Sequence, residues 1–385
     1  MSRLKVDNIR HNSATSDALV LSNDGSVAIG TCTATTFNST NIVNSTQLSH
    51  RNLCINGADM MVAQRGTSTT GLQNAGGVYT IDRFSHRRDG TWSNAQFKHE
   101  QVNSGTGLFK KALKVTCTTA EGAAPSGAQS VMIGHYLESQ DTIAAFGDGS
   151  AEAKSFTISF YVKASIATTY VSQITTHHLS TNVDIYKTFV VNSANTWERK
   201  TLTFPAITNS VGTLSGGVGD NAMGYQIHWM LDAETGTKSL DTYQTGAGVY
   251  KFPAAVSTTS FSNTLNATFE LGGVQIEAGS VATELEHRVY ADELRRCQRY
   301  FEIVTGCIRQ ADYNNYIGVT APFKVTKRAE PTNTHVSDGN ASGVSFQSFV
   351  SGMSAELKLE GCFPQWSSSA AGYAYGFKIT SEAEI

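Results

Sequence analysis

Short runs in which apolar and polar residues alternate recur along most of this 385-residue chain. In the clearest run, Phe156, Ile158, Phe160 and Val162 alternate with small or polar residues, so one side of an extended segment is apolar. A period of two is that of a β-strand with one buried face. The same pattern predicts strands at Ala112–Cys117, Ala128–Leu137, Ile185–Val191, Trp197–Phe204 and Met223–Leu231. Because the chain also holds 34 glycines and only 16% charged residues, it is predicted to be all-β.

The run Met223–Leu231 separates its two faces most clearly. Tyr225 and Trp229 belong to the apolar face, whereas Gln226 and His228 share the other face. The period of two thus divides the side chains of this predicted strand between two faces.

A strand is expected to pass into a helix within Leu271–Phe301. The alternation in Thr268–Glu277 slips by one residue at Gly272-Gly273, which is typical of a β-bulge. Thr283 and Glu286 have the spacing of a capping box at a helix start. The apolar face expected for this helix consists of Val289, Tyr290, Leu294, Cys297, Tyr300, Phe301 and Val304.

The two ends of the chain differ from its middle. Residues 1–50 contain almost no aromatic residues, so they bury little by themselves, although Ala18–Thr31 has the pattern of a β-hairpin. Gly306 is expected to end the helix, and a small antiparallel β region follows. Its predicted strands are Tyr316–Thr326, Gly343–Val350, Ala355–Leu359 and Gly372–Thr380, with Tyr373, Tyr375, Phe377 and Ile379 on one face of the last.

Composition argues against several functions. The formal net charge of -3 gives no electrostatic basis for binding nucleic acid. No stretch approaches the roughly 18 apolar residues of a membrane span, and the start lacks the apolar core of a secretory signal. The six cysteines have no C-x-x-C spacing, so we expect free and mostly buried thiols rather than a metal site or disulfide scaffold.

Motifs for catalysis and cofactors are lacking, so we expect no enzyme activity, no cofactor and no metal. G-x-S-x-G, H-E-x-x-H and a phosphate loop do not occur. Asp232–Gly236 only weakly resembles a calcium loop. A glycosidase needs two carboxylates facing one cleft, and sequence cannot place together any two of Glu138, Asp141, Asp232 and Asp241.

Sugar binding makes smaller demands, because one exposed aromatic ring and a few polar groups suffice. The loop or edge aromatics suited to stacking on a sugar include Tyr250 and the four residues taken as glycan-binding candidates, which are Trp92, Tyr186, Tyr243 and Trp366. Each of these rings could instead belong to a core. A separate polar cluster is expected where Asp82 and Arg83 meet Gln64 or Arg65.

Several segments resemble bacteriophage tail-fibre proteins. DGSVAIGT is similar to the G-N-V-G-I-G-T signature of tail-fibre shafts, and the opening resembles virion fibre proteins of marine phages. RNLCINGADMMVAQRG and YTIDRF resemble the start of a carbohydrate-module-like β-sandwich in such fibres, with Phe84 where tryptophan is usual. SFTISFYVKAS, NTWERKTLTFP, VQIEAGSVATELE and ELRRCQRYF match later segments in the same order. Glu284 and Leu285 replace the usual Pro-Phe, and the family pattern would start the helix near Val289.

This resemblance implies an antiparallel, jelly-roll-like β-sandwich over residues 51–300, a small β domain over 301–385 and a virion-attachment or shaft segment over 1–50. It implies a homotrimeric tail-fibre subunit of the virion that binds host-surface polysaccharide or lipopolysaccharide through loops of the β-sandwich and of the C-terminal domain. Residues 1–50 would contact other tail or capsid proteins. A purely structural fibre or adaptor and, less favoured, a glycan-cleaving tailspike are the alternatives.

Overall fold

A computed structural model describes most of the chain. The described residues are 8–9, 19–21, 27–29, 51–73, 77–215, 221–245, 250–254, 256, 258–310, 316–350 and 354–384. The chain divides into two compact units, Met1–Thr46 and Gln47–Ile385.

In the first unit, three short strands form one antiparallel sheet: β1 (Asn8–Ile9), β2 (Leu19–Leu21) and β3 (Val27–Ile29). Leu19 pairs with Ile29 across β2 and β3, so the hairpin predicted in Ala18–Thr31 is confirmed at its two strands. The rest of residues 1–50 lies outside the described residues, and the predicted attachment role of this segment stays a prediction.

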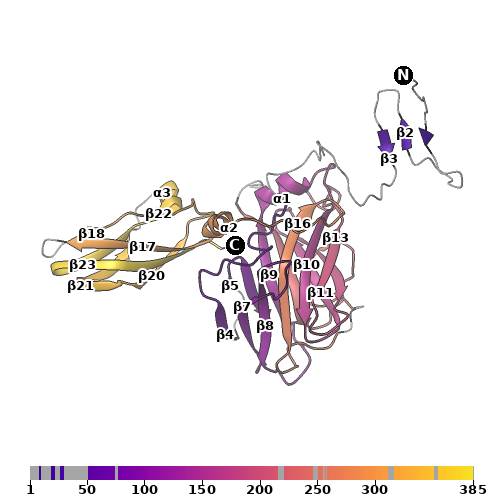
Figure 1. Ribbon diagram of the computed structural model, residues 1–385, viewed down its shortest axis with the longest axis horizontal. Coiled ribbons are helices and arrows are strands. Elements are labelled where there is room, and N and C mark those ends of the chain that lie inside the picture. Colours follow the sequence, from indigo (N-terminus) through magenta and orange to yellow (C-terminus); the bar gives the residue numbers. More distant parts are fainter. Residues whose placement is uncertain are drawn as a thin grey trace. The chain divides into compact units, whose positions relative to one another are not determined.

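The second unit begins with a β-sandwich of two antiparallel sheets (Figure 1). The first sheet has the order β13-β10-β16-β8-β7-β4, and the second has the order β15-β12-β11-β14-β9-β6-β5. The strands of the first sheet are β4 (Ser68–Leu72), β7 (Gln96–Asn103), β8 (Lys111–Thr119), β10 (Phe156–Ala164), β13 (Glu198–Phe204) and β16 (Thr268–Ala278). The strands of the second sheet are β5 (Val78–Ile81), β6 (Phe84–Asp89), β9 (Ser130–Glu138), β11 (Thr169–Thr176), β12 (Val183–Val190), β14 (Met223–Ala233) and β15 (Gln244–Thr245). The predicted antiparallel, jelly-roll-like sandwich is confirmed.

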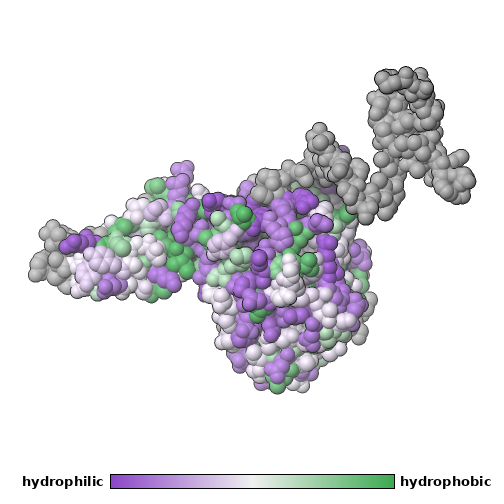
Figure 2. All heavy atoms as spheres, viewed as in Figure 1, coloured by the Kyte–Doolittle hydropathy of each residue, from purple (hydrophilic) through white to green (hydrophobic). Residues whose placement is uncertain are grey.

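The apolar faces of the two sheets meet in one core. Phe160 of the first sheet packs edge-on against Trp229 of the second, with 5.8 Å between ring centroids. Helix α1 (Ser139–Phe146) adds Phe146, which stacks on Phe156 at 4.9 Å. Figure 2 shows that hydrophilic residues dominate the visible surface of the sandwich, with hydrophobic residues in small separate groups. None of the helices in the described part of the chain has the length and apolar character needed to span a bilayer.

The β-bulge expected at Gly272-Gly273 is present. The pairing of β10 with β16 shifts register there, and Gly273 has φ 56°, a left-handed conformation that glycine adopts without a Cβ clash. The Asn52 side chain lies against the same region, donating to the Val274 carbonyl oxygen at 3.0 Å and accepting from the Ile276 amide at 3.0 Å. The segment that precedes β4 is thereby fixed to β16.

The helix is shorter than the capping-box pattern predicted. Helix α2 spans Tyr290–Gln298 and follows an extended Val289, which agrees with the later start implied by the family pattern. Thr283 instead donates from its hydroxyl to Glu277 at 2.7 Å, so no capping box forms. Val289 and Tyr290 are largely exposed, whereas Cys297 and Tyr300 are buried, so the predicted apolar face is correct only in its second half.

The chain then turns directly into a strand, because β17 (Phe301–Gln310) starts where the longer helix was expected to continue. Gly306 therefore lies within β17 and does not end the helix. Five of the six cysteines lie in the described part of the chain, and all five are free thiols. Four of these are buried and Cys307 is exposed, which agrees with the prediction of free and mostly buried thiols.

The C-terminal region is a sheet arranged around β23 (Pro364–Glu382), which pairs with every other strand of that sheet. Those strands are β17, β18 (Tyr316–Gly318), β20 (Thr332–Ser337) and β21 (Asn340–Phe349). A two-stranded sheet of β19 (Ala321–Pro322) and β22 (Gly361–Cys362) completes the region. Residues 355–359, predicted as a strand, lie in helix α3 (Ala355–Glu360), whose Leu357 and Leu359 are too few to bury a strand face.

A polar cluster joins the sandwich to the C-terminal strand. Gln64 donates to the Asp82 carboxylate from its amide nitrogen at 2.9 Å and from its side chain at 2.5 Å, as predicted. Arg83 is fully buried and forms an ion pair with Glu384, while its guanidinium lies 3.4 Å from the centre of the Tyr300 ring. The orientation of the C-terminal sheet on the sandwich therefore depends on buried charge pairing.

Candidate functional site

Two of the four aromatic residues predicted to bind glycans are held in the interior by their indole nitrogens. Trp92 is 8% exposed and donates to the Asp89 carbonyl oxygen at 2.7 Å. Trp366 is fully buried, donates to Asp338 at 2.7 Å and packs 4.8 Å from the Phe377 ring. Neither ring has a free face on which a sugar could stack.

The other two aromatic candidates also take part in packing. Tyr186 is fully buried, and its hydroxyl accepts a hydrogen bond from Gln173 at 3.1 Å. Tyr243 is half-buried against the sandwich core and donates to the Pro205 carbonyl oxygen at 2.6 Å. The placement of these four residues gives no support to their predicted role, and the site has to be sought elsewhere.

The second sheet of the sandwich has an outer face that carries polar residues. In the sheet register, Gln226 of β14 lies between Thr175 of β11 and Tyr136 of β9. Opposite residues of antiparallel strands project to the same side of a sheet, so these side chains form one row. The next row includes Gln173, His228 and Gly134. Gln226 and His228 therefore share one face, as the alternation predicted, and this face is turned away from the core.

The chain that follows β14 covers part of this face. Met132, Val171 and Met230 of the sheet pack against Tyr250 and Phe252 of that segment in a separate apolar cluster. Arg87 and Asp89 of β6 and His177 after β11 lie beside the polar rows and are half-buried, whereas Tyr136, Gln226 and Tyr250 are buried. We call the residues Arg87, Tyr136, His177, Gln226 and Tyr250 the outer-face site.

A chain of hydrogen bonds fixes the centre of the outer-face site. His177 Nε2 lies 3.1 Å from Gln226 Oε1, and Asn182 Nδ2 lies 3.3 Å from His177 Nδ1. The Tyr250 hydroxyl donates to the same Gln226 oxygen at 3.2 Å. Burial lowers the pKa of His177, and a neutral ring protonated at Nε2 satisfies both of its contacts. The amide of Gln226 is thus held in one orientation.

Arg87 supplies the positive charge of the site. Its guanidinium lies 4.3 Å from the centre of the Tyr250 ring, and Arg87 Nε donates to Asp89 at 3.0 Å. Burial raises the pKa of Tyr250 to about 12, so its hydroxyl keeps its proton. One cation, one carboxylate, two phenols and an amide therefore lie within a small area.

His228 lies beneath the site, fully buried between Tyr136 and Tyr250. Neither of its ring nitrogens has a hydrogen-bond partner in the structure, and burial lowers its pKa well below 6.5. Gly134 leaves the space that this packing needs, because a Cβ there would lie 2.6 Å from Ser85 Oγ and 3.1 Å from the Tyr136 hydroxyl oxygen. His228 is therefore neutral, with one ring nitrogen able to donate and the other able to accept a hydrogen bond beneath the outer-face site.

Three of the carboxylates considered for glycan hydrolysis have other partners. Glu138 accepts from Arg299 at 2.8 and 2.9 Å and from the Tyr300 hydroxyl at 2.5 Å. Asp232 accepts from the Ser262 amide at 2.8 Å, and Asp241 forms an ion pair with Lys187. The Asp232 carboxylate thus accepts a hydrogen bond from a later loop, which contains Ser262. Within the described residues, no group of three or more His, Cys, Asp and Glu side chains could hold a metal ion.

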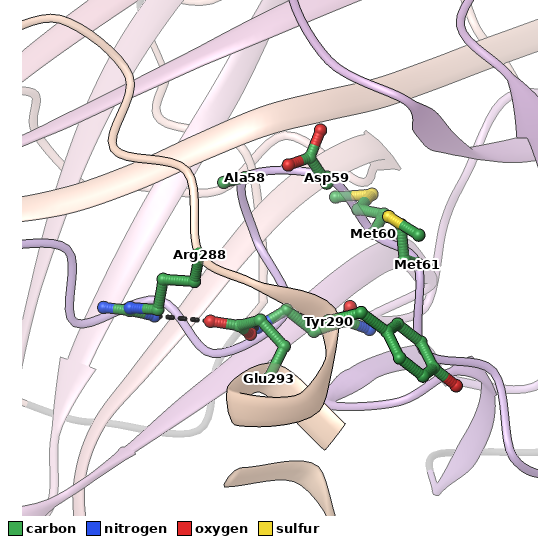
Figure 3. Close-up of a pocket in the computed structure, with 8 residues that line it drawn as sticks. Ala58, Asp59, Met60, Met61, Arg288, Tyr290 and Glu293 are labelled. Atoms are coloured by element: carbon green, nitrogen blue, oxygen red, sulfur yellow. Dashed lines mark hydrogen bonds and ion pairs between the residues drawn. The ribbon is translucent and has the colours of Figure 1, made fainter. Parts of the chain in front are cut away.

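A small pocket lies between the segment before β4 and helix α2 (Figure 3). Its cavity volume is about 10 Å³, which is room for a single water molecule. Arg288 and Glu293 form an ion pair of 2.7 Å at this pocket, and Tyr290 points away from that pair. The pocket is too small for a sugar ring.

No protein-family model matches this chain, and no curated protein matches its sequence. Solved structures that resemble it include carbohydrate-binding modules and a phage tailspike domain. The enzymatically active domain of tailspike protein 4 from bacteriophage CBA120 matches 59% of this chain and 21% of its own length, with 10% identity and a TM-score of 0.31.

Two binding modules show a similar degree of likeness. The family 11 carbohydrate-binding module of Clostridium thermocellum, solved with a mixed-linked tetrasaccharide, matches 58% of this chain and 99% of its own, with 15% identity and a TM-score of 0.28. A xylan-binding domain of Paenibacillus barcinonensis matches 59% of this chain and 97% of its own, with 10% identity and a TM-score of 0.26. At these scores the likeness identifies neither a family nor a function for this chain.

Proposed function

We propose that this chain is a virion tail-fibre subunit that binds host-surface glycans through the outer-face site without cleaving them. The observation that carries glycan binding is the pairing of Arg87 and Tyr250 beside the fixed amide of Gln226. Sugars offer hydroxyl groups that both donate and accept, and hydrogen-bonding groups held in one orientation lose little entropy on binding. The order of the fibre-like segments along the sequence supports the virion role.

Replacing Arg87 with alanine is expected to weaken glycan binding about tenfold, because the substitution removes the site's cation and exposes one face of Tyr250. The measurement is binding of the full-length chain to an array of bacterial lipopolysaccharides and capsular polysaccharides. Lys163→Ala is the matched control: both side chains are 25% exposed, ion-paired and placed over an aromatic ring, but Lys163 belongs to the first sheet. Equal losses in the two variants would count against the outer-face site.

The same assay separates the alternatives. A wild-type chain that binds no glycan on the array would favour a purely structural fibre or adaptor. Release of reducing sugar from a bound polysaccharide, abolished by Asp89→Asn, would favour a glycan-cleaving tailspike, since Asp89 is the carboxylate beside Arg87. We expect binding without release.

The fibre role also includes assembly. We propose that three copies associate, that residues 1–50 attach them to tail or capsid proteins, and that the protein acts on the virion surface. Three sites on one fibre raise the effective concentration for the second and third contact, so weak sugar binding becomes strong attachment. Light scattering on the full-length chain is expected to give three times the mass of one chain. A monomeric mass would overturn the trimer.

A further inference from the structure

Strand β23 changes the face on which it presents its side chains near Gly376. In its pairing with β17, Gly306 lies opposite Phe377, and the next residue, Cys307, lies opposite Tyr375. The register shift leaves Gly376 as the extra residue, with a left-handed φ of 74°. Tyr375 therefore projects to the side opposite Phe377, although a regular strand would place both on one face.

The shift takes two tyrosines out of the C-terminal core. Phe377 and Ile379 are buried in that core, whereas Tyr375 is 44% exposed and Tyr373 is half-buried. The rings of Tyr373 and Tyr375 stack, with centroids 4.7 Å apart and planes 20° from parallel. At this separation and angle the two rings lie face to face, so each covers one face of the other and the pair stands partly exposed on the sheet.

Polar residues of the neighbouring strands surround this pair of rings. Across the sheet, Tyr373 pairs with Arg309 on one side and Ser342 on the other, and Tyr375 pairs with Asn340. Lys378, on the far side of the shift, pairs with Thr305 and so projects to the same face. We call Tyr373, Tyr375, Arg309, Asn340 and Lys378 the tyrosine face.

The charge on the tyrosine face is positive. Arg309 and Lys378 form no ion pair with any acidic side chain in the described part of the chain. Glu382, on the same face, instead contacts Arg65 of the sandwich at 3.3 Å. A ligand with negative charges spaced along β23 would complement these two cations, which flank the rings.

We propose that the tyrosine face is a second glycan-binding site of this chain and that its ligand is an acidic polysaccharide. The inference deepens the proposed function and rests on it. The apolar face of a pyranose can pack on the exposed part of the Tyr375 ring, and carboxylates of neighbouring sugars would reach Arg309 and Lys378.

A second copy of the chain fits this face less well than a glycan does. The cores of protein interfaces are depleted of lysine and serine and of charge in general. Here Ser342 pairs with Tyr373 across the sheet, and Lys378 follows Tyr375 on the same face beyond the register shift. A polar face with unpaired cations is suited to a hydrated, charged polymer.

The test is affinity electrophoresis of the full-length chain in native gels that contain polygalacturonate, with neutral dextran as the comparison. Wild-type protein is expected to be retarded by polygalacturonate and not by dextran. Tyr375→Ala and Arg309→Ala are each expected to weaken that retardation about tenfold. Tyr290→Ala is the matched control, because Tyr290 is 49% exposed on α2 and lies outside both sites.

The outcomes are distinguishable. Undiminished retardation of Tyr375→Ala and Arg309→Ala would overturn the tyrosine face, and if Arg87→Ala still lost array binding the proposed function would stand. Equal retardation in dextran, or none by polygalacturonate in wild type, would overturn the acidic ligand. A Tyr375→Ala variant that binds normally but loses its oligomeric state in light scattering would show that a second copy occupies the face.

Discussion

Replacing Glu384 with alanine is expected to lower the free energy of unfolding by about 3–5 kcal/mol, which is the usual cost of leaving one charge of a buried ion pair without its partner. Arg83 is fully buried, and Glu384 is the carboxylate that forms its ion pair. The remaining contacts of the guanidinium are the Tyr136 carbonyl oxygen at 2.7 Å and the face of the Tyr300 ring. These neutral groups cannot replace the missing negative charge.

Urea unfolding of the full-length chain is the measurement, and Glu382→Ala is its control. Glu382 is 46% exposed and contacts Arg65 at 3.3 Å, so its loss is expected to cost less than about 1 kcal/mol. In an Arg83→Met background, Glu384→Ala should cost far less than in the wild-type chain, because no buried charge remains to be neutralised. Equal costs in the two backgrounds would contradict this account of the junction.

The junction shows what the sequence could predict and what it could not. Gln64 and Asp82 are 18 residues apart, and their pairing was expected from the motif that contains them. Arg83 and Glu384 are 301 residues apart, and a carboxylate near the end of the chain has no local pattern that points to one arginine. Long-range charge pairs form because burial demands a counter-charge, and sequence does not show which segments are buried together.

Only part of the outer-face site could be predicted from the sequence, because its residues come from segments that lie far apart along the chain. Alternation in β14 correctly grouped Gln226 and His228 on one face, and the structure shows that this face is turned away from the core. Arg87, His177 and Tyr250 come from three other segments, and only the strand order brings them to Gln226. Tyr250 was among the loop or edge aromatics considered for sugar stacking, whereas no local pattern pointed to Arg87 or His177.

The aromatic candidates show the limit of alternation. Tyr186 lies on the outer face of its sheet, yet the segment after β14 covers that face and buries the ring. Tyr375 was expected to share a face with Phe377, and a one-residue register shift at Gly376 separates them. Periodicity specifies which residues share a face, but not what covers that face or where a bulge reverses it.

Acidification from pH 7 to pH 4 is expected to destabilise the sandwich through the buried pair His86 and His99. His86 alone is expected to lower the free energy of unfolding by about 3 kcal/mol. Both rings are fully buried in the core, with His86 Nδ1 3.0 Å from His99 Nε2. Burial, with a contribution from Arg88, lowers the pKa of His86 from 6.5 to about 3. Burial, with a contribution from His86, lowers the pKa of His99 well below 6.5.

The direction follows from where protons bind. The unfolded chain takes up protons on these imidazoles below about pH 6.5, whereas the folded state keeps them neutral, so stability falls as the pH drops through this range. Asp82 and Asp232 act in the opposite direction, because burial raises their pKa and the folded state binds their protons more readily. A comparison of variants is therefore needed to isolate the histidines.

Urea midpoints at pH 7 and pH 4 supply that comparison. The double variant His86→Leu/His99→Leu keeps similar side-chain volumes and removes both titrating groups, so it should lose at least about 3 kcal/mol less than wild type between the two pH values. His287→Gln is the control, since the His287 side chain is 48% exposed, and it should follow the wild-type curve. Parallel curves for wild type and the double variant would mean that the pair accepts a proton without opening the core. His86 belongs to β6 of the second sheet and His99 to β7 of the first. A proton on either ring therefore places a charge with no acidic partner of its own between the two sheets, beside the Phe97 ring.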